Sequence, residues 1–391
     1  MAAMQRRAAI VGIGQTAYAS ALGSSEAALA VTAIHRALDD AGMAARDIDG
    51  VCRYDIESTT DGDLTRLLGL ESVRFFSSHS HGGGAYCGQL ASAAAAVTTG
   101  LASTVVCFRA RNRGRRSSFG PQALAGGRPW EKVPPRLSGG SQFTVPFGVQ
   151  SPVQEMAILA RRHMHEHGTT TEHFGEVAVA MRAHAAVNPL AVMRTPLTLA
   201  DHRESRWISE PLRLFDCCIE TDGACAAILT TAERARDRPH RAAFVLATAQ
   251  SAGTAHHRLL DWFAHDRRSW ATRAAARLWG AAGVTPADVD AAMLYDHFTP
   301  MVLVALEDWG FCAPGEGGPF VAGGRLRWPD GALPVNTNGG QLSEAFVHGF
   351  NNVLEGVRQV RGTSTSQVPG AEVVFIAAAA SDPSGAVLLC R

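Results

Sequence analysis

Two stretches far apart in the chain follow the same pattern. Residues 41–55 and 282–296 align without a gap and are identical at six of the fifteen positions. The matches are Ala41 and Gly42 with Ala282 and Gly283, Asp47 and Asp49 with Asp288 and Asp290, and Tyr54 and Asp55 with Tyr295 and Asp296. Each stretch indicates the end of a helix, a glycine stop, a short turn and a strand. We interpret the chain as an internal duplication of two similar halves.

The start of the chain shows the same alternation. Residues 8–14 predict a buried strand, and residues 24–42 predict a helix that Ser24 or Ser25 caps and Gly42 ends. With the strand predicted before Tyr54, this is a βαβ-type unit, which is typical of α/β proteins. The first half is predicted to cover residues 1–237 and the second half residues 238–391.

One region interrupts this alternation. Residues from about 110 to 215 are rich in Gly, Pro, Arg and His, and only residues 151–168 among them clearly indicate a helix. We predict an inserted loop region in the first half. Inserted loops often cover active sites, so a site is expected beneath it.

Composition excludes several classes of function. The 36 Lys and Arg residues balance the 36 Asp and Glu residues, so no net charge favours nucleic acid or an anionic membrane. The eight cysteines form no CxxC pair, and His163, His165 and His167 alternate along a predicted helix, so no metal site is expected. No apolar run is long enough for a signal peptide or a membrane span. We expect a cytoplasmic protein.

The stretch AAMLYDHFTP, residues 291–300, places three polar side chains at a predicted strand end. Tyr295 is a candidate for proton transfer, because a phenol with a pKa near 10 can serve if a neighbour lowers it. His297 is a second candidate, whereas Asp296 is expected to orient the strand end or a histidine. The alternative is that Tyr295 and Asp296 are partly inherited architecture, since Tyr54 and Asp55 repeat them.

Two glycine-rich segments precede predicted helices. The first contains Gly83 and Gly84, and the second contains Asn338, Gly339 and Gly340. Backbone N–H groups at a helix start can hold an oxyanion or a phosphate, and asparagine amides can stabilise an enolate oxygen. Tight turns that let a helix pack closely would need the same glycines. His348 is predicted to lie inside the second helix and is a further candidate for proton transfer.

Two other features have a functional and a structural interpretation. Cys87 follows His79 and His81, which suggests a thiol nucleophile, but a buried structural cysteine is favoured. The run RARNRGRR, residues 109–116, suits the phosphates of coenzyme A, although a solvated face or a subunit contact is commoner. The candidates for phosphate contact in this run are Arg109, Arg111, Arg115 and Arg116.

The order of these motifs resembles that of the thiolase superfamily, and in particular of its lipid-transfer-protein-like branch, which is related to sterol-carrier-protein thiolases. The motifs are the duplicated halves, GGG at 82–84, YDHF at 295–298, NTNGG at 336–340 with HG at 348–349, and SDPSGAVLL at 381–389. The resemblance implies a five-layer αβαβα sandwich with a loop region inserted in the first half. It also implies a homodimer.

The resemblance also bears on the chemistry. Thiolases use two cysteines and a histidine at positions that here hold about Gly83, about Ala379 and Phe346, so acyl-cysteine chemistry is not implied. Tyr295 at the start of YDHF resembles the aldolases that cleave steroid side chains as coenzyme A thioesters. Those enzymes work with a small partner that carries an OB-fold and a zinc ribbon. They are also expected to carry a second tyrosine at about Phe346.

We therefore expect a retro-aldolase that acts on a β-hydroxyacyl-CoA, with CoA as part of the substrate and no bound cofactor. Tyr295 is the main candidate for proton transfer, and His297 or His348 could take the role that Phe346 cannot. One alternative is an acyltransferase or Claisen-type enzyme that uses Cys87. Another is a non-catalytic CoA-binding or lipid-binding protein.

Overall fold

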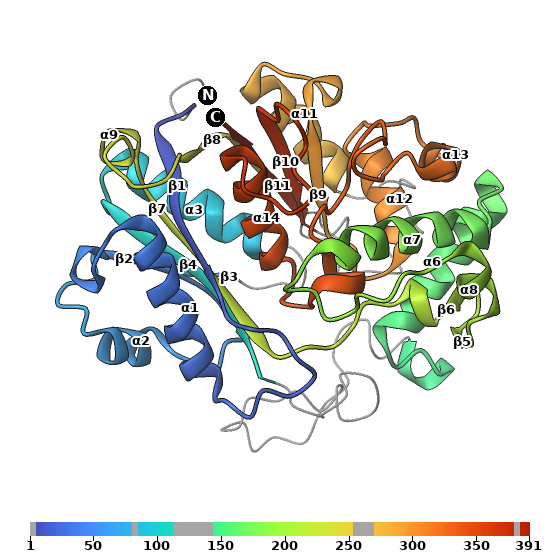
Figure 1. Ribbon diagram of the computed structural model, residues 1–391, viewed down its shortest axis with the longest axis horizontal. Helices are drawn as coiled ribbons and strands as arrows, with labels where there is room; N and C mark the ends of the chain where they lie inside the picture. Colours follow the sequence, from blue (N-terminus) through green and yellow to red (C-terminus); the bar gives the residue numbers. More distant parts are fainter. Residues whose placement is uncertain (1–4, 80–84, 113–143, 253–269, 379–383) are drawn as a thin grey trace.

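The computed structural model describes residues 5–79, 85–112, 144–252, 270–378 and 384–391 (Figure 1). The predicted site residues Gly83, Gly84, Arg115 and Arg116 lie outside these ranges, as does Ala379. Within them, no helix is long and apolar enough to cross a membrane. The same ranges hold no group of three or more His, Cys, Asp or Glu side chains that could bind a metal ion.

Nine strands form one continuous sheet in the order β3-β2-β4-β7-β1-β8-β11-β10-β9. Their bounds are β1 (Ala8–Gln15), β2 (Gly50–Tyr54), β3 (Phe75–His79), β4 (Thr104–Arg111), β7 (Gly223–Thr231), β8 (Ala243–Ser251), β9 (Ala291–Leu294), β10 (Val373–Ala377) and β11 (Ser384–Cys390). The two halves join where β1 pairs antiparallel with β8, at Ala9 with Phe244 and Ile10 with Ala243. Outward from this junction, the order β1-β7-β4-β2 is matched by β8-β11-β10-β9.

Helices lie on both sides of each half of the sheet. The five layers are an outer helix, the first half of the sheet, the central helices, the second half of the sheet and further outer helices. The outer helices are α1 (Glu26–Ala41) on the first half and α11 (Ala271–Ala282) with α12 (Thr299–Asp308) on the second. Between the two halves lie α3 (Ala85–Thr99) and α14 (Phe350–Arg361), which contact strands of both. Strand residues alternate between these environments, because successive side chains point to opposite faces. Thus Ala9 and Val11 pack with α1, while Ala8 and Ile10 pack with α3 and α14.

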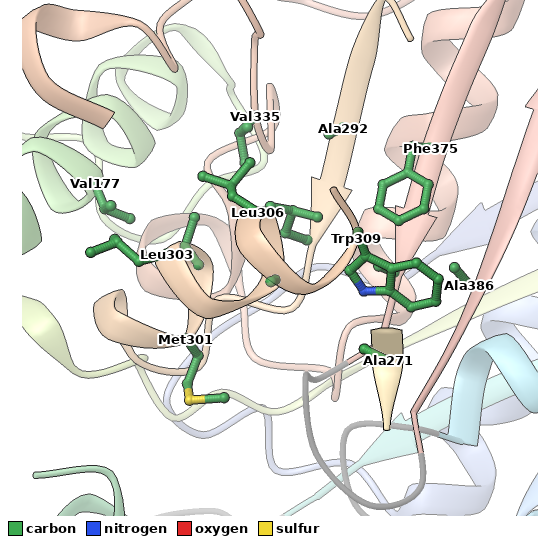
Figure 2. Packing of buried hydrophobic residues seen from close by; sticks show 14 of the residues in the cluster. Val177, Ala271, Ala292, Met301, Leu303, Leu306, Trp309, Val335, Phe375 and Ala386 are labelled. Atoms are coloured by element: carbon green, nitrogen blue, oxygen red, sulfur yellow. The ribbon is translucent and has the colours of Figure 1, made fainter. Parts of the chain in front are cut away.

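The described part of the inserted region adds helices and a small hairpin beside the second half (Figure 1). Its elements are α6 (Pro152–His167), α7 (Thr171–Val187), α8 (Leu199–Glu204), β5 (Trp207–Ser209) and β6 (Leu212–Arg213). Figure 2 shows how α12 connects this region to the sheet: Leu303 lies towards Val177 of α7, and Trp309 packs against Phe375 of β10. The remaining short helices are α2 (Asp61–Leu68), α9 (Ala232–Ala235) and α13 (Gly317–Val321).

The repeated segments fold alike. In the first, Ser25 caps α1 by accepting a hydrogen bond from the backbone N–H of Ala28, and Gly42 ends the helix with φ 61°. In the second, Gly283 ends α11 with φ 71°, and a 3-10 turn over Pro286–Asp288 leads into β9. The helix ends and strands predicted for both copies are confirmed. The division of the chain at residues 237 and 238 stays a prediction.

The prediction of one continuous helix after Gly340 is wrong. Residues Gly340–Glu344 form a single short π-helix, and α14 begins only at Phe350. His348 therefore precedes the helix, in the left-handed region at φ 48°. The continuous helix fails because Ala345 is extended and Gly349 has φ 83°.

Candidate active site

Tyr295 lies directly after β9, at the centre of a group of aromatic rings. Its ring centroid is 4.7 Å from that of His297, 6.2 Å from that of Tyr86 in α3, and 6.5 Å from that of Phe346. Tyr295 is buried, whereas His297 and Phe346 are each partly exposed. The structure thus brings together the predicted proton-transfer pair, Tyr295 and His297, with one member accessible.

Asp296 turns away from this group and holds the neighbouring loop. Its carboxylate accepts hydrogen bonds from the backbone N–H groups of Gln341 at 2.8 Å and Leu342 at 3.2 Å. Burial raises the pKa of Asp296 to about 6, although these hydrogen bonds act in the opposite direction. A Cβ atom at Gly340 would overlap this carboxylate. The carboxylate thus fixes the loop at residues 341–342, and its predicted role in orienting the strand end or a histidine stays a prediction.

The NTNGG segment is held by a buried carboxylate. Glu344 accepts hydrogen bonds from the amide groups of Asn338, of Asn351 at 2.8 Å, and of Asn188 in the inserted region at 3.0 Å. Burial raises the pKa of Glu344 to about 7. A Cβ atom at Gly339 would overlap Ala185 of α7. Close packing therefore explains the glycines, and substrate contact by Asn338, Gly339 and Gly340 stays a prediction.

His348 lies between two arginines. Arg109 donates from Nε to Nδ1 at 2.9 Å, and a guanidinium nitrogen of Arg111 lies 3.1 Å from Nε2. The imidazole also stacks on Tyr54, with ring centroids 5.6 Å apart. Because guanidinium groups stay charged and only donate, a proton added to His348 would place a third positive charge beside two others. His348 is buried, whereas His297 is partly exposed, and a role of either in proton transfer stays a prediction.

Arg109 and Arg111 are only 3% and 2% exposed. Arg109 forms an ion pair with Glu57 at 2.6 Å, and Arg111 lies over the ring of Phe346, 4.5 Å from its centroid. Both side chains point into the same region as His348 and away from the surface. Their predicted contact with CoA phosphates stays a prediction.

Comparison with known proteins agrees with the motifs. Residues 251–386 match the family described as Thiolase C-terminal domain-like. The chain is 42% identical to the 17-hydroxy-3-oxo-4-pregnene-20-carboxyl-CoA lyase of Mycobacterium tuberculosis, over 98% of this chain and 99% of that protein. It is also 42% identical to a steroid side-chain-cleaving aldolase of Thermomonospora curvata, over 100% of this chain and 99% of the other. This chain belongs to the thiolase superfamily, in its lipid-transfer-protein-like branch.

A solved structure resembles this thiolase-superfamily member over its whole length. It is described as the Ltp2-ChsH2(DUF35) aldolase, and it superposes with a TM-score of 0.90 at 40% identity, covering 100% of this chain and 99% of the other. The similarity therefore includes both halves and the inserted region.

Cys87, which could have replaced the nucleophile of other superfamily members, is fully buried in the first turn of α3. Burial raises the pKa of its thiol well above the ordinary value. Its sulfur faces the backbone carbonyl of Ile376 at 3.8 Å. A buried thiol with a raised pKa is not activated as a nucleophile, which favours the structural interpretation.

Several residues of the site escaped the sequence analysis. Tyr86 follows the glycine run, and nothing in its local sequence indicates that it stacks on Tyr295. Glu57 and Asn188 belong to no recognised motif, and their partners lie 52 and 156 positions away. Gly349 was not singled out either, although a Cβ atom there would meet Tyr86 and Tyr295. Only Gly349 had a usable signal, since a glycine beside a candidate histidine can mark a close approach.

Proposed function

We propose that this protein cleaves a β-hydroxyacyl-CoA thioester by a retro-aldol reaction, giving a ketone and a shorter acyl-CoA. The observation that carries the proposal is the contact between Tyr295 and the partly exposed His297 at the end of β9. It is supported by the 42% identity to two proteins whose names describe a lyase and a steroid side-chain-cleaving aldolase. A steroid or similarly bulky carbon skeleton is therefore the proposed substrate class.

The reaction transfers one proton and breaks one carbon–carbon bond. The β-hydroxyl loses its proton, the bond between the α and β carbons breaks, and its electron pair forms the thioester enolate. The enolate then takes a proton at the α carbon, so the protons balance without any cofactor. We assign the first transfer to His297, which takes the β-hydroxyl proton, and the return of a proton to the α carbon to Tyr295. A proton then passes from His297 to Tyr295, whose rings are in contact, so both groups regain their starting state.

Charge near the site supports enolate formation. Arg109 and Arg111 contact the 346–348 segment, while Glu57 is the carboxylate paired with Arg109. In a water-poor interior, a fixed positive field of this kind stabilises a developing negative charge more strongly than it would in water. The same proposal includes contact of Asn338, Gly339 and Gly340 with the substrate. It also includes contact of the arginines in residues 109–116 with the phosphates of CoA.

The assignment is tested by measuring release of ketone and short acyl-CoA from steroid-type β-hydroxyacyl-CoA substrates. Tyr295→Phe and His297→Gln should each lower kcat by about 10²–10⁴, the usual contribution of a positioned acid or base. Tyr18→Phe and His163→Gln are matched controls outside this group of rings and should retain kcat. Normal turnover by Tyr295→Phe would remove Tyr295 from the mechanism, and an acyl-enzyme adduct would favour acyl transfer instead.

We also propose that the protein acts as a homodimer joined at β3. This strand pairs only with β2 and forms one end of the described sheet, and it carries Phe76 with 69% exposure. An exposed edge with a large apolar side chain is a surface on which a second copy can add a strand. Phe76→Lys should convert the dimer to a monomer in light scattering, and a dimer unchanged by this substitution would contradict the proposal.

A small protein with an OB-fold and a zinc ribbon is the proposed second partner. Support comes from the name of the similar solved structure, which includes a DUF35 protein. Co-purification with the product of a neighbouring gene of that type tests this, and failure of the two proteins to co-elute would contradict it. We place the reaction in the cytoplasm, since all eight cysteines are free, as in a reducing compartment.

A further inference from the structure

The end of β9 is paired to a side chain instead of a strand. On one side, β9 pairs along its whole length with β10. On the other side, residues 334–336 run beside it only briefly: Ala292 donates to the carbonyl of Pro334 at 3.0 Å and accepts from the backbone of Asn336 at 2.9 Å. The neighbouring chain then turns away, which leaves the peptide groups of Leu294 without a strand partner on that side.

The amide group of Asn336 takes the place of the missing strand. Its Oδ1 accepts from the backbone N–H of Leu294 at 2.7 Å, and its Nδ2 donates to the carbonyl of Leu294 at 2.9 Å. Asn352 of α14 donates a second hydrogen bond to this carbonyl at 2.8 Å. One side-chain amide thus makes both of the hydrogen bonds that a neighbouring strand would make to Leu294.

The backbone of Asn336 is unusual as well. It has φ 49°, in the left-handed region, and its side chain is fully buried. Asparagine is among the few non-glycine residues that adopt this conformation readily. The turn at Asn336 directs the chain away from β9 while its amide stays in line with Leu294.

Leu294 is the residue before Tyr295, and Asp296 after it is held by Gln341 and Leu342. The backbone on both sides of Tyr295 is therefore fixed by the segment 336–342. We propose that Asn336 is a positioning residue for Tyr295. The side-chain amide of Asn336 sets the direction of the Tyr295 phenol ring towards His297 and Tyr86. The kinetic part of this inference rests on the proposed function.

Two substitutions separate the possible roles. Asn336→Asp keeps the shape of the side chain but removes the donor to the carbonyl of Leu294. Asn336→Gly removes both hydrogen bonds and relieves the left-handed backbone, so it provides a folded variant if Asn336→Asp is too unstable. The matched control is Gln359→Glu in α14, because Gln359 is also a fully buried amide that donates to a backbone carbonyl, that of Ser366 at 2.9 Å.

The kinetic test compares kcat and KM with the melting temperature. A displacement of a reacting group by about 1 Å can cost about 10² in rate, so the Asn336 variants should lose about 10- to 100-fold in kcat. KM should stay within about twofold, and Gln359→Glu should lower the melting temperature without this loss. Equal effects of the Asn336 and Gln359 variants on kcat would overturn the inference and leave Asn336 a purely structural role.

A second readout does not depend on turnover. The chain has four tyrosines, so the phenol titration of Tyr295 can be obtained from ultraviolet absorbance as the difference between the wild type and Tyr295→Phe. The Asn336 variants should shift this titration, whereas Gln359→Glu should not. If the wild type cleaves none of the thioesters, the proposed function fails, yet an unshifted titration would still overturn the role of Asn336 separately.

Discussion

A substitution at Gly349 tests the packing around Tyr295 most directly. Gly349 has φ 83°, and a Cβ atom there would lie 2.8 Å from Cδ2 of Tyr295 and closer still to the ring of Tyr86. Alanine would therefore add two costs to the folded state. The left-handed backbone costs roughly 1–2 kcal/mol, and overpacking against two buried rings costs about 1–3 kcal/mol. Gly349→Ala should lower the free energy of unfolding by about 2–5 kcal/mol.

Gly362 provides the control, because it has φ 80° at the other end of α14 and a Cβ atom there would meet nothing within 4 Å. Gly362→Ala should show the backbone cost alone. The difference between the two variants in denaturant unfolding therefore isolates the contact with Tyr86 and Tyr295, about 1–3 kcal/mol.

The same contact predicts a loss of activity. Gly349→Ala should lower kcat by about 10² if the ring of Tyr295 moves by about 1 Å, whereas Gly362→Ala should keep the wild-type kcat. If both variants unfold at the same denaturant concentration and turn over substrate equally well, the reasoning from this contact is wrong.

Three further outcomes follow from Glu57, Asp296 and Phe346. Glu57→Gln leaves Arg109 buried without its ion-pair partner and should cost about 3–5 kcal/mol in denaturant unfolding, whereas Glu210→Gln, at an exposed ion pair, should cost less than about 1 kcal/mol. The folded chain raises the pKa of Asp296 to about 6, so it keeps this proton to a higher pH than the unfolded chain does. The free energy of unfolding should therefore fall as the pH rises from about 4 to about 6. In Asp296→Asn this fall should be smaller by roughly 3 kcal/mol, and an unchanged pH dependence would contradict the raised pKa. Phe346→Tyr should change kcat by less than about threefold if a proton donor is already in place, and a rise of about 10²–10⁴ would show that the role was vacant.

The fold could be read from the sequence wherever local chemistry decides it. Ser25 and Gly42 fix the two ends of α1, and Gly283 ends α11, so both copies of the repeat were predictable from capping and turn residues. The joining of the two halves of the sheet through β1 and β8 was not predictable, because it depends on a pairing between residues more than 200 positions apart.

The site was predictable only where it coincides with a strand end. Tyr295 and His297 stand out because an apolar run stops at them. The position of His348 was predicted wrongly because buried hydrogen bonds shape the chain around Glu344. The Glu344 carboxylate accepts from three asparagine amides, and one of them, Asn188 of the inserted region, lies 156 positions away. No helical periodicity in the sequence reports such a tether.

The duplication gives each half an equivalent tyrosine, but only one of the two is a candidate for proton transfer. Tyr54 is the last residue of β2, Tyr295 directly follows β9, and each precedes an aspartate. Tyr54, however, is fully buried beside Arg109 and His348. The residues that follow differ: position 56 is an isoleucine, whereas position 297 is a histidine that contacts its tyrosine. Arg109 and Tyr54 of the first half instead contact His348, and the segment that contains His348 also places Phe346 beside Tyr295. The first half thus supports the candidate site of the second, and the histidine at position 297 is one difference between the two copies.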